Sequence, residues 1–193
     1  MPLSTAAPRE RLHTRQIECQ GFQRTDGLWD IEAHMTDRKS YAFPSDERGE
    51  VVAGTPIHDM WVRVTLDDSF HILAIEAATD SAPYRICPEI TPNFQRLVGL
   101  RIGPGFNARV RERLGGTEGC THLVELMGPL ATTAFQTIFS AKHRAARESG
   151  KPRESAADKD KPRKRPALLG TCHAFAPDSP VTKRNWPDFY TGS

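Results

Sequence analysis

The spacing of hydrophobic residues changes once along the chain, from every second residue to every third or fourth. Trp29, Ile31, Ala33 and Met35 alternate with the polar residues between them. This alternation is typical of a β-strand with one buried face. Segment 15–41 is predicted to hold two strands joined at Thr25-Asp26-Gly27, a hairpin signal. The same alternation predicts strands at 58–67 and 70–80, with residues 44–56 as the loop before them.

Helical spacing begins after residue 90. Thr91-Pro92 is a helix start and Gly99 a helix end, and Pro104 opens a second helix that Gly115-Gly116 ends. A third helix is predicted from about Gly119 to Ala146, with a kink or break at Pro129 because proline has no backbone N–H to donate. Its apolar stripe consists of Leu123, Leu126, Met127, Leu130, Ala134 and Ile138.

These elements predict an α+β fold, in which an antiparallel β-meander of about four strands is followed by three helices packed on one face of the sheet. We expect a flexible N-terminus over 1–14 and a single domain over 15–148. Segment 149–166, SGKPRESAADKDKPRKRP, has almost nothing to bury and is predicted to be a disordered basic linker. The apolar and aromatic residues of 167–193 favour a tail that docks back on the domain.

Composition narrows the function classes. The 193 residues carry a formal net charge of only +2, which gives little support to nucleic-acid binding. No apolar run is long enough to span a membrane, and residues 1–16 lack the apolar centre of an export signal. We therefore expect a cytoplasmic protein without a membrane partner. A protein partner is compatible with the sequence, but its identity is unknown.

Four widely spaced cysteines, Cys19, Cys87, Cys120 and Cys172, lie outside any CxxC motif. Without an export signal we expect thiols rather than a disulfide framework. Cys19 falls on the predicted inner face of the first strand and is interpreted as a core residue. The other three remain candidates for packing, reactivity or metal binding.

The first candidate site is Cys120 with His122, in GGTEGCTHLVEL. A cysteine in the first turn of a helix is close to unpaired N–H groups and the positive end of the helix dipole, which favour the thiolate. A thiolate is both a nucleophile and a metal ligand. The alternative is a buried small residue followed by a capping or surface histidine.

Three further candidates stand near the ends of predicted elements. His58 begins a strand and could be a ligand or general base oriented by Asp59, or the pair could bond local backbone. Cys87 lies between the last strand and the first helix, where it could be a ligand or a packing residue. Cys172, beside His173 in the tail, could add a ligand if the tail folds back, or be incidental.

Asp30, Glu32 and His34 share the polar face of the second strand. They could support a metal site or transfer protons, but a solvated strand face explains the same pattern.

Several segments taken together resemble an uncharacterised bacterial family catalogued as a domain of unknown function (family 2889). They are DGLWDIEAHMTD, PIHDMWVRVTLD, PYRICP, LVGLRIGPGF, RERLGGTEGCTHLVEL and the tail segments TCHAF and WPDFY. The resemblance covers about 12–147 and 167–190. It implies membership of the family and no particular activity.

The order of strands, cysteine, helices and second cysteine is distantly similar to iron–sulfur scaffold proteins of the NifU and SufE type. In those proteins, cysteines and an acid or histidine at such junctions bind zinc or a cluster, and Cys87 and Cys120 stand in comparable places. The early cysteine of the scaffolds has no counterpart here, because His58-Asp59 stands in its place.

The leading hypothesis is a metal-binding protein. Cys87, Cys120 and His122 would be ligands together with His58 or Cys172, with Asp59, Asp30 and Glu32 in support, and the cofactor would be Zn or an Fe–S cluster. One alternative is a metal-free enzyme with Cys120 as nucleophile. Another is a non-catalytic interaction module. The sequence leaves it undecided whether the protein is an enzyme.

Overall fold

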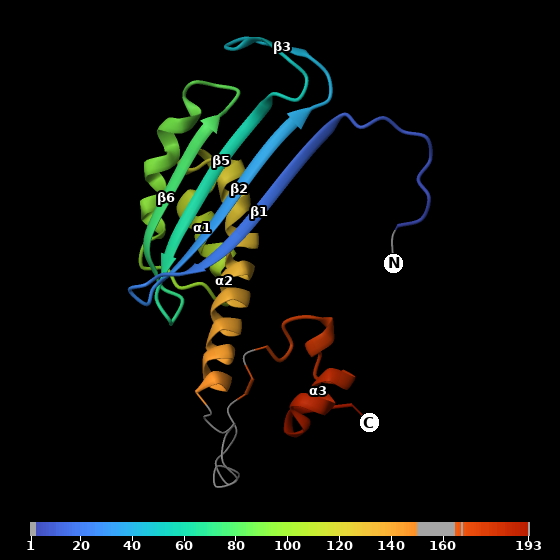
Figure 1. The fold of residues 1–193 in the computed structure, drawn as a ribbon, viewed down its shortest axis with the longest axis vertical. Coiled ribbons are helices and arrows are strands. Elements are labelled where there is room, and N and C mark those ends of the chain that lie inside the picture. The colour runs from blue at the N-terminus through green and yellow to red at the C-terminus, as the bar shows by residue number, and fades with distance from the viewer. Residues whose placement is uncertain (1–2, 150–164, 167, 193) are drawn as a thin grey trace. The chain divides into compact units, whose positions relative to one another are not determined.

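The computed structural model describes residues 3–149, 165–166 and 168–192. Four antiparallel strands form its main sheet: β1 (His13–Gln23), β2 (Trp29–Lys39), β5 (Pro56–Leu66) and β6 (Ile72–Ser81). They lie in the order β1-β2-β5-β6, so each strand pairs with its neighbour in this series (Figure 1). Sheet and helices confirm the predicted α+β meander.

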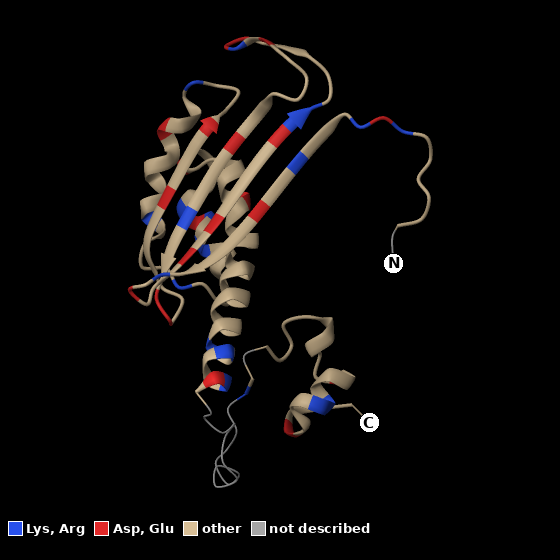
Figure 2. Ribbon diagram, viewed as in Figure 1, with Lys and Arg blue, Asp and Glu red and all other residues tan. Residues whose placement is uncertain are grey.

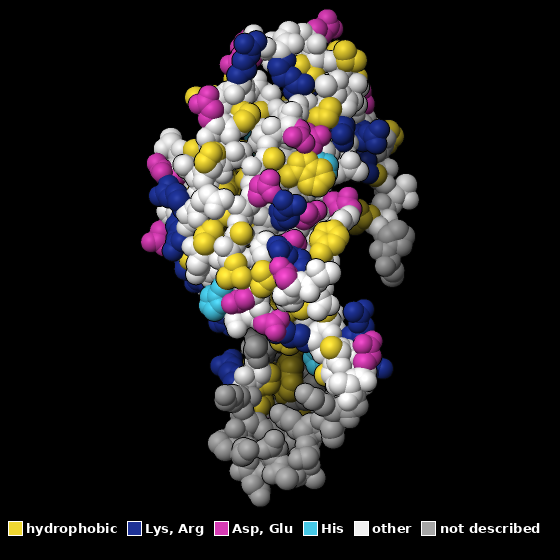
Figure 3. Space-filling view, turned by 60° about the vertical axis from the view of Figure 1, so that its left-hand side comes forward, with side chains coloured by type: hydrophobic (Ala, Val, Ile, Leu, Met, Phe, Trp, Pro, Cys, Tyr) yellow, Lys and Arg dark blue, Asp and Glu magenta, His cyan; other side chains and the backbone are white. Residues whose placement is uncertain are grey.

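The two faces of the sheet differ in character because side chains alternate along each strand. Trp29, Ile31, Ala33 and Met35 of β2 are buried on the inner face, which the helices cover. On β5 the buried set is Met60, Val62, Val64 and Leu66. Charged residues lie at intervals along all four strands, as the bands in Figure 2 show, and hydrophobic side chains lie among charged ones on the surface seen in Figure 3.

The helical half of the domain follows β6. It consists of the 3-10 helix η1 (Cys87–Leu97), the α-helix α1 (Phe106–Leu114), the short η2 (Gly116–Glu118) and the long α2 (Thr121–Glu148). Phe94, Leu97, Phe106, Val110 and Leu114 join the core cluster beneath the inner face. The predicted stripe of α2 is buried in full: Leu123, Leu126, Met127, Leu130, Ala134 and Ile138.

The structure differs from the sequence predictions in three places. The loop at 44–56 contains a small hairpin of β3 (Phe43–Ser45) and β4 (Gly49–Val51). The first helix is a 3-10 helix that begins at Cys87, before Thr91-Pro92. α2 continues through Pro129, so the helix is not broken there. Tertiary burial of its apolar stripe stabilises the turns on both sides of the proline.

The chain divides into two compact units, 1–149 and 150–193. In the second unit, η4 (His173–Phe175), α3 (Pro180–Asn185) and η5 (Pro187–Phe189) surround a contact between the rings of Phe175 and Trp186, whose centroids are 5.3 Å apart. The predicted linker falls largely on 150–164, outside the described residues, and the docking of the tail stays a prediction. Among the helices that the structure describes, none is long and apolar enough to cross a membrane.

Candidate functional site

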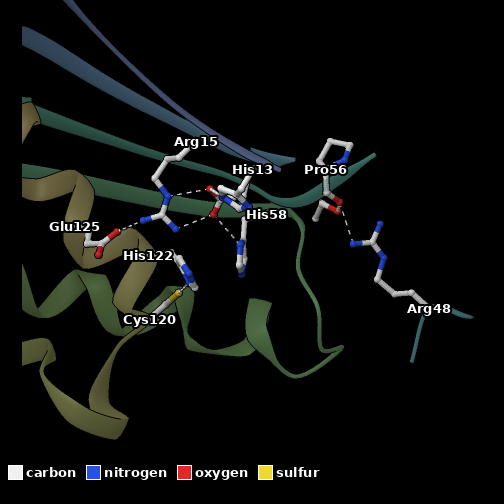
Figure 4. Close-up of polar contacts among 10 residues, drawn as sticks. His13, Arg15, Arg48, Pro56, His58, Cys120, His122 and Glu125 are labelled. Atoms are coloured by element: carbon white, nitrogen blue, oxygen red, sulfur yellow. Dashed lines mark hydrogen bonds and ion pairs between the residues drawn. The ribbon is translucent and has the colours of Figure 1, made fainter. Parts of the chain in front are cut away.

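The inner face of the sheet turns from apolar to polar at one end. Arg15 of β1 lies opposite Asp37 of β2, and Asp37 lies opposite His58 of β5. The three residues therefore form one row across adjacent strands, next to the row that contains Met35 and Met60. This register brings a cation, an anion and an imidazole side by side at the rim of the core (Figure 4).

The start of α2 lies over this row. Cys120 is the residue before the first turn, and His122 and Glu125 lie within the first two turns. The His122 ring lies 3.8 Å from the His58 ring, centroid to centroid, and its Nδ1 is 3.9 Å from the Cys120 Sγ. Arg15 pairs with Glu125, so one guanidinium joins β1 both to β2 and to α2.

Asp37 is the most enclosed charge in the site, with its side chain only 1% exposed. Arg15 donates to both of its oxygens, from Nε at 2.9 Å and from a terminal nitrogen at 2.7 Å. His13 Nε2 lies 3.0 Å from Oδ1, and His58 Nδ1 lies 2.9 Å from Oδ2. Burial alone would raise the pKa of Asp37, but the hydrogen bonds from Arg15 and His13 hold it well below its usual range.

Both histidines that face each other favour the neutral form. Burial lowers the pKa of His58, and the neighbouring His122 lowers it further, while the bond to Asp37 opposes the shift. Burial also lowers the pKa of His122, with a smaller contribution from the charge of Arg15. Neutral imidazoles can bind a metal ion or accept a proton.

Asp37, His58 and His122 could hold a metal ion. One ligand atom from each lies within 4.8 Å of the other two, and among the described residues no other trio of histidine, cysteine or acidic side chains meets this criterion. We call these three residues the His/Asp cluster. Two imidazoles and a carboxylate are ligands of zinc and other divalent transition metals.

The structure brings together some of the predicted ligands. His58 and His122 are in the His/Asp cluster, and Cys120 contacts His122. Cys87 is half-buried at the start of η1 and is not in the cluster. Cys172 is exposed in the second unit, at the start of η4, and its role as a ligand stays a prediction.

The predicted supporting residues are on the outer face of the sheet. Asp59 contacts His34 Nε2 at 2.7 Å, so the carboxylate at His58 is Asp37 rather than Asp59. His34 in turn stacks on Trp61, with ring centroids 3.6 Å apart. Asp30 accepts from the Thr65 hydroxyl, and Glu32 lies 3.5 Å from Arg63. They take part in cross-strand contacts, on the face opposite the His/Asp cluster.

Asp37, Arg15 and His13 were not predicted as site residues, although the alternation contains the signal for Asp37. The inner-face series Trp29, Ile31, Ala33, Met35 continues to Asp37, which places a charged residue in the phase of the core. A buried unpaired charge is costly, so such a position calls for partners on the neighbouring strands. The register that supplies Arg15 and His58 could not be read from the sequence alone.

Comparisons with known proteins give a family without an activity. No curated protein and no solved structure matches this chain. The model of one family, described as "Protein of unknown function (DUF2889)", matches residues 13–136, which include the strands of the main sheet and the first part of α2. Since this match spans most of the chain, the protein belongs to the DUF2889 family.

Proposed function

We propose that the protein binds a divalent transition-metal ion of the zinc type at the His/Asp cluster. The observation that carries this proposal is the convergence of Asp37, His58 and His122, whose ligand atoms lie within 4.8 Å of one another. They come from β2, β5 and α2, so the folded domain holds them together although they are far apart in sequence.

The orientation of His58 supports the proposal. Its Nδ1 lies 2.9 Å from Asp37 Oδ2, so an ion bound by both side chains would take the place of the hydrogen bond between them. Metal-binding histidines commonly use one ring nitrogen for the ion and donate the other N–H to a carboxylate or carbonyl, and Nε2 would be the donating nitrogen of His58. Because the pKa values of His58 and His122 are lowered, both rings are neutral at pH 7, which is the form that binds metals.

Cys120 contacts His122 but lies outside the His/Asp cluster, so it would become a further ligand only after its side chain moved toward His58 and Asp37. Its Sγ is 3.9 Å from His122 Nδ1, and a sulfur and a nitrogen on one tetrahedral zinc are about 3.6 Å apart given usual bond lengths. A set of two imidazoles, one carboxylate and one thiol favours zinc over an iron–sulfur cluster, whose ligands are mainly thiolates.

Arg15 opposes metal binding at the same point. It occupies both oxygens of Asp37 and brings a positive charge to the cluster. We therefore expect Arg15→Gln to bind Zn²⁺ more tightly than the parent chain, because the carboxylate is released and the repulsion is removed. Weaker binding by a folded Arg15→Gln variant would contradict a ligand role for Asp37.

Calorimetric titration of the untagged full chain with Zn²⁺, and absorption spectra with Co²⁺, test the proposal directly. We expect one ion per chain, with His58→Gln and His122→Gln each weakening binding at least about tenfold. His71→Gln is the matched control, because His71 also pairs with a carboxylate, Asp67 at 3.0 Å, but is not part of the cluster. Unchanged affinity in both cluster variants would refute the proposal.

The contact between Cys120 and His122 also favours a second candidate, a metal-free enzyme that uses the thiol as nucleophile. It predicts that iodoacetamide labels Cys120 faster than Cys19, whose pKa is raised by burial. Chelator-treated protein separates the two candidates. Fast labelling that persists without metal and falls in His122→Gln supports the enzyme, whereas protection of Cys120 by added Zn²⁺ supports the metal site.

A further inference from the structure

The two edge strands of the main sheet, β6 and β1, differ in how their outer backbone groups are hydrogen-bonded. At the β6 edge, Ile72 exchanges backbone hydrogen bonds of 2.8 Å with Gly99 and Leu100, and Gln95 of η1 donates to the carbonyl of Ile75. At the β1 edge, the described residues show no backbone hydrogen bond from 13–23 beyond the ladder to β2. β1 therefore presents free N–H and C=O groups along its length.

β1 also lacks several of the features that commonly block an open edge, although it carries the charged side chains of Arg15 and Glu18. It runs for 11 residues and pairs with β2 without a register shift, whereas the β2–β5 and β5–β6 ladders are both bulged. Its sequence, HTRQIECQGFQ, contains no proline and no lysine. A long, regular and exposed edge is a template for another strand.

Exposed hydrophobic side chains on this edge follow a symmetric pattern. Leu12, Ile17 and Phe22 are 52%, 43% and 43% exposed and stand five residues apart. Side-chain alternation puts Leu12 and Phe22 on the outer face and Ile17 on the inner face. An antiparallel two-fold centred on Ile17 would pair each residue with the one at 34 minus its number, so that all three would face an apolar partner.

We propose that two copies of the chain associate through antiparallel β1–β1 pairing centred on Ile17, which joins their sheets into one continuous sheet. Ile17 meets Ile17 of the partner subunit, and Leu12 meets Phe22 of the partner subunit. The second copy is favoured over a foreign strand because the apolar positions of β1 are complementary to β1 itself. This is the isologous arrangement of a two-fold dimer.

Charge also favours this register over the one centred on Glu18. Centred on Ile17, Gln16 faces Glu18 of the partner subunit, and Arg15 faces Cys19 of the partner subunit, so no like charges are opposed. Centred on Glu18, two carboxylates would be directly opposite, which is destabilising. The small net charge of +2 adds little general repulsion between copies.

Sedimentation equilibrium of the full chain over a range of concentrations is the first test. We expect the parent chain to form dimers and Ile17→Lys to shift to monomers, because two lysines would then be opposed at the two-fold. Leu73→Lys is the matched control, since Leu73 is similarly exposed, at 47%, but lies on β6. Circular dichroism shows whether each variant is folded, and Phe22→Lys is the substitute should Ile17→Lys not fold.

Mild oxidation tests the register. Ile17→Cys should form a disulfide-linked dimer, and a mixture of Leu12→Cys and Phe22→Cys chains should form the mixed disulfide-linked dimer. Both yields should exceed the yield from the parent chain, which has four native cysteines. Glu18→Cys should not form a disulfide-linked dimer above that of the parent chain. A parent chain that stays monomeric, a dimer that survives Ile17→Lys, or cross-linking of Glu18→Cys as strong as that of Ile17→Cys would overturn the proposal.

Discussion

Asp37 shows how a single residue can organise the end of a core. It occupies an inner-face position where the preceding inner-face residues of β2 are apolar. Arg15, His13 and His58 are hydrogen-bonded to its carboxylate from three directions, and the guanidinium of Arg15 compensates its charge. An uncompensated carboxylate at 1% exposure would be strongly destabilising. The stability of this end of the core therefore depends on the contacts that Arg15, His13 and His58 make with Asp37.

The pKa shifts of His58 and His122 predict a pH dependence of stability in the metal-free protein. Both pKa values lie below the unfolded value of about 6.5. As the pH falls, the unfolded chain therefore binds more protons at these two residues than the folded chain does. The free energy of unfolding should be greatest above this value and decrease as the pH falls through it toward the folded pKa values. Urea unfolding between pH 8 and 5, with chelator present, measures the slope.

In the double variant His58→Gln with His122→Gln, the free energy of unfolding should depend less on pH than in the parent chain. His71→Gln should leave the pH dependence as in the parent. Asp37 and Arg15 face both rings, and neither changes charge between pH 8 and 5: the pKa of Asp37 is lowered and that of Arg15 is raised. An equally steep decrease in the double variant would show that other groups cause it.

Site residues were predictable where their types and positions were local signals. Cys120 and His122 stand at a helix start that glycines and apolar periodicity mark, and His58 lies near the start of a strand, in the phase of its buried residues. The carboxylate partner of His58 could not be predicted from neighbouring residues. Asp59 follows His58 in sequence but points to the other face of the sheet, whereas Asp37 is brought to His58 by the β2–β5 register.

At the scale of elements, the packing of β1 against α2 depends on Gly21. A Cβ at this position would lie 2.0 Å from Thr137 Oγ1 and 2.8 Å from its Cβ. We expect Gly21→Ala to destabilise the domain by about 1–3 kcal/mol, because strand and helix must move apart. Gly103→Ala is the control, since nothing lies within 4 Å of a Cβ there.

Urea unfolding measures the difference, and adding Thr137→Ala should recover part of the loss. A Gly21→Ala domain as stable as the parent would mean that β1 and α2 separate at little cost. Such separation would also contradict a rigid β1, on which both the site and the β1–β1 pairing depend.

Periodicity predicted the main elements better than their details. The alternation from Trp29 to Met35 and at 58–67, like the apolar stripe of α2, reflects burial on one face, and the structure shows this burial. Pro129 was expected to kink or break its helix because of a local rule. The helix is not broken there, since six buried residues along α2 stabilise it on both sides. The hairpin β3–β4 lies in a segment rich in turn formers, where short strands leave no periodic signal.

At the scale of the whole molecule, the core cluster belongs to one unit. Its residues run from Trp29 to Ile138, within the unit 1–149, and the family match ends at 136. The change in composition alone predicted a domain boundary at 148, since segment 149–166 has few residues that can be buried. Whether the tail docks on the domain depends on long-range contacts, which composition cannot predict.

A fragment ending at Ser149 should fold by itself and retain the His/Asp cluster. Every residue of the core cluster and of the proposed metal site is included, so we expect cooperative urea unfolding and the same Zn²⁺ affinity as in the full chain. The difference in unfolding free energy between fragment and full chain measures what residues 150–193 add. A fragment that does not unfold cooperatively would show that the second unit is required for the core, whereas a folded fragment with weakened Zn²⁺ binding would favour Cys172 as a ligand.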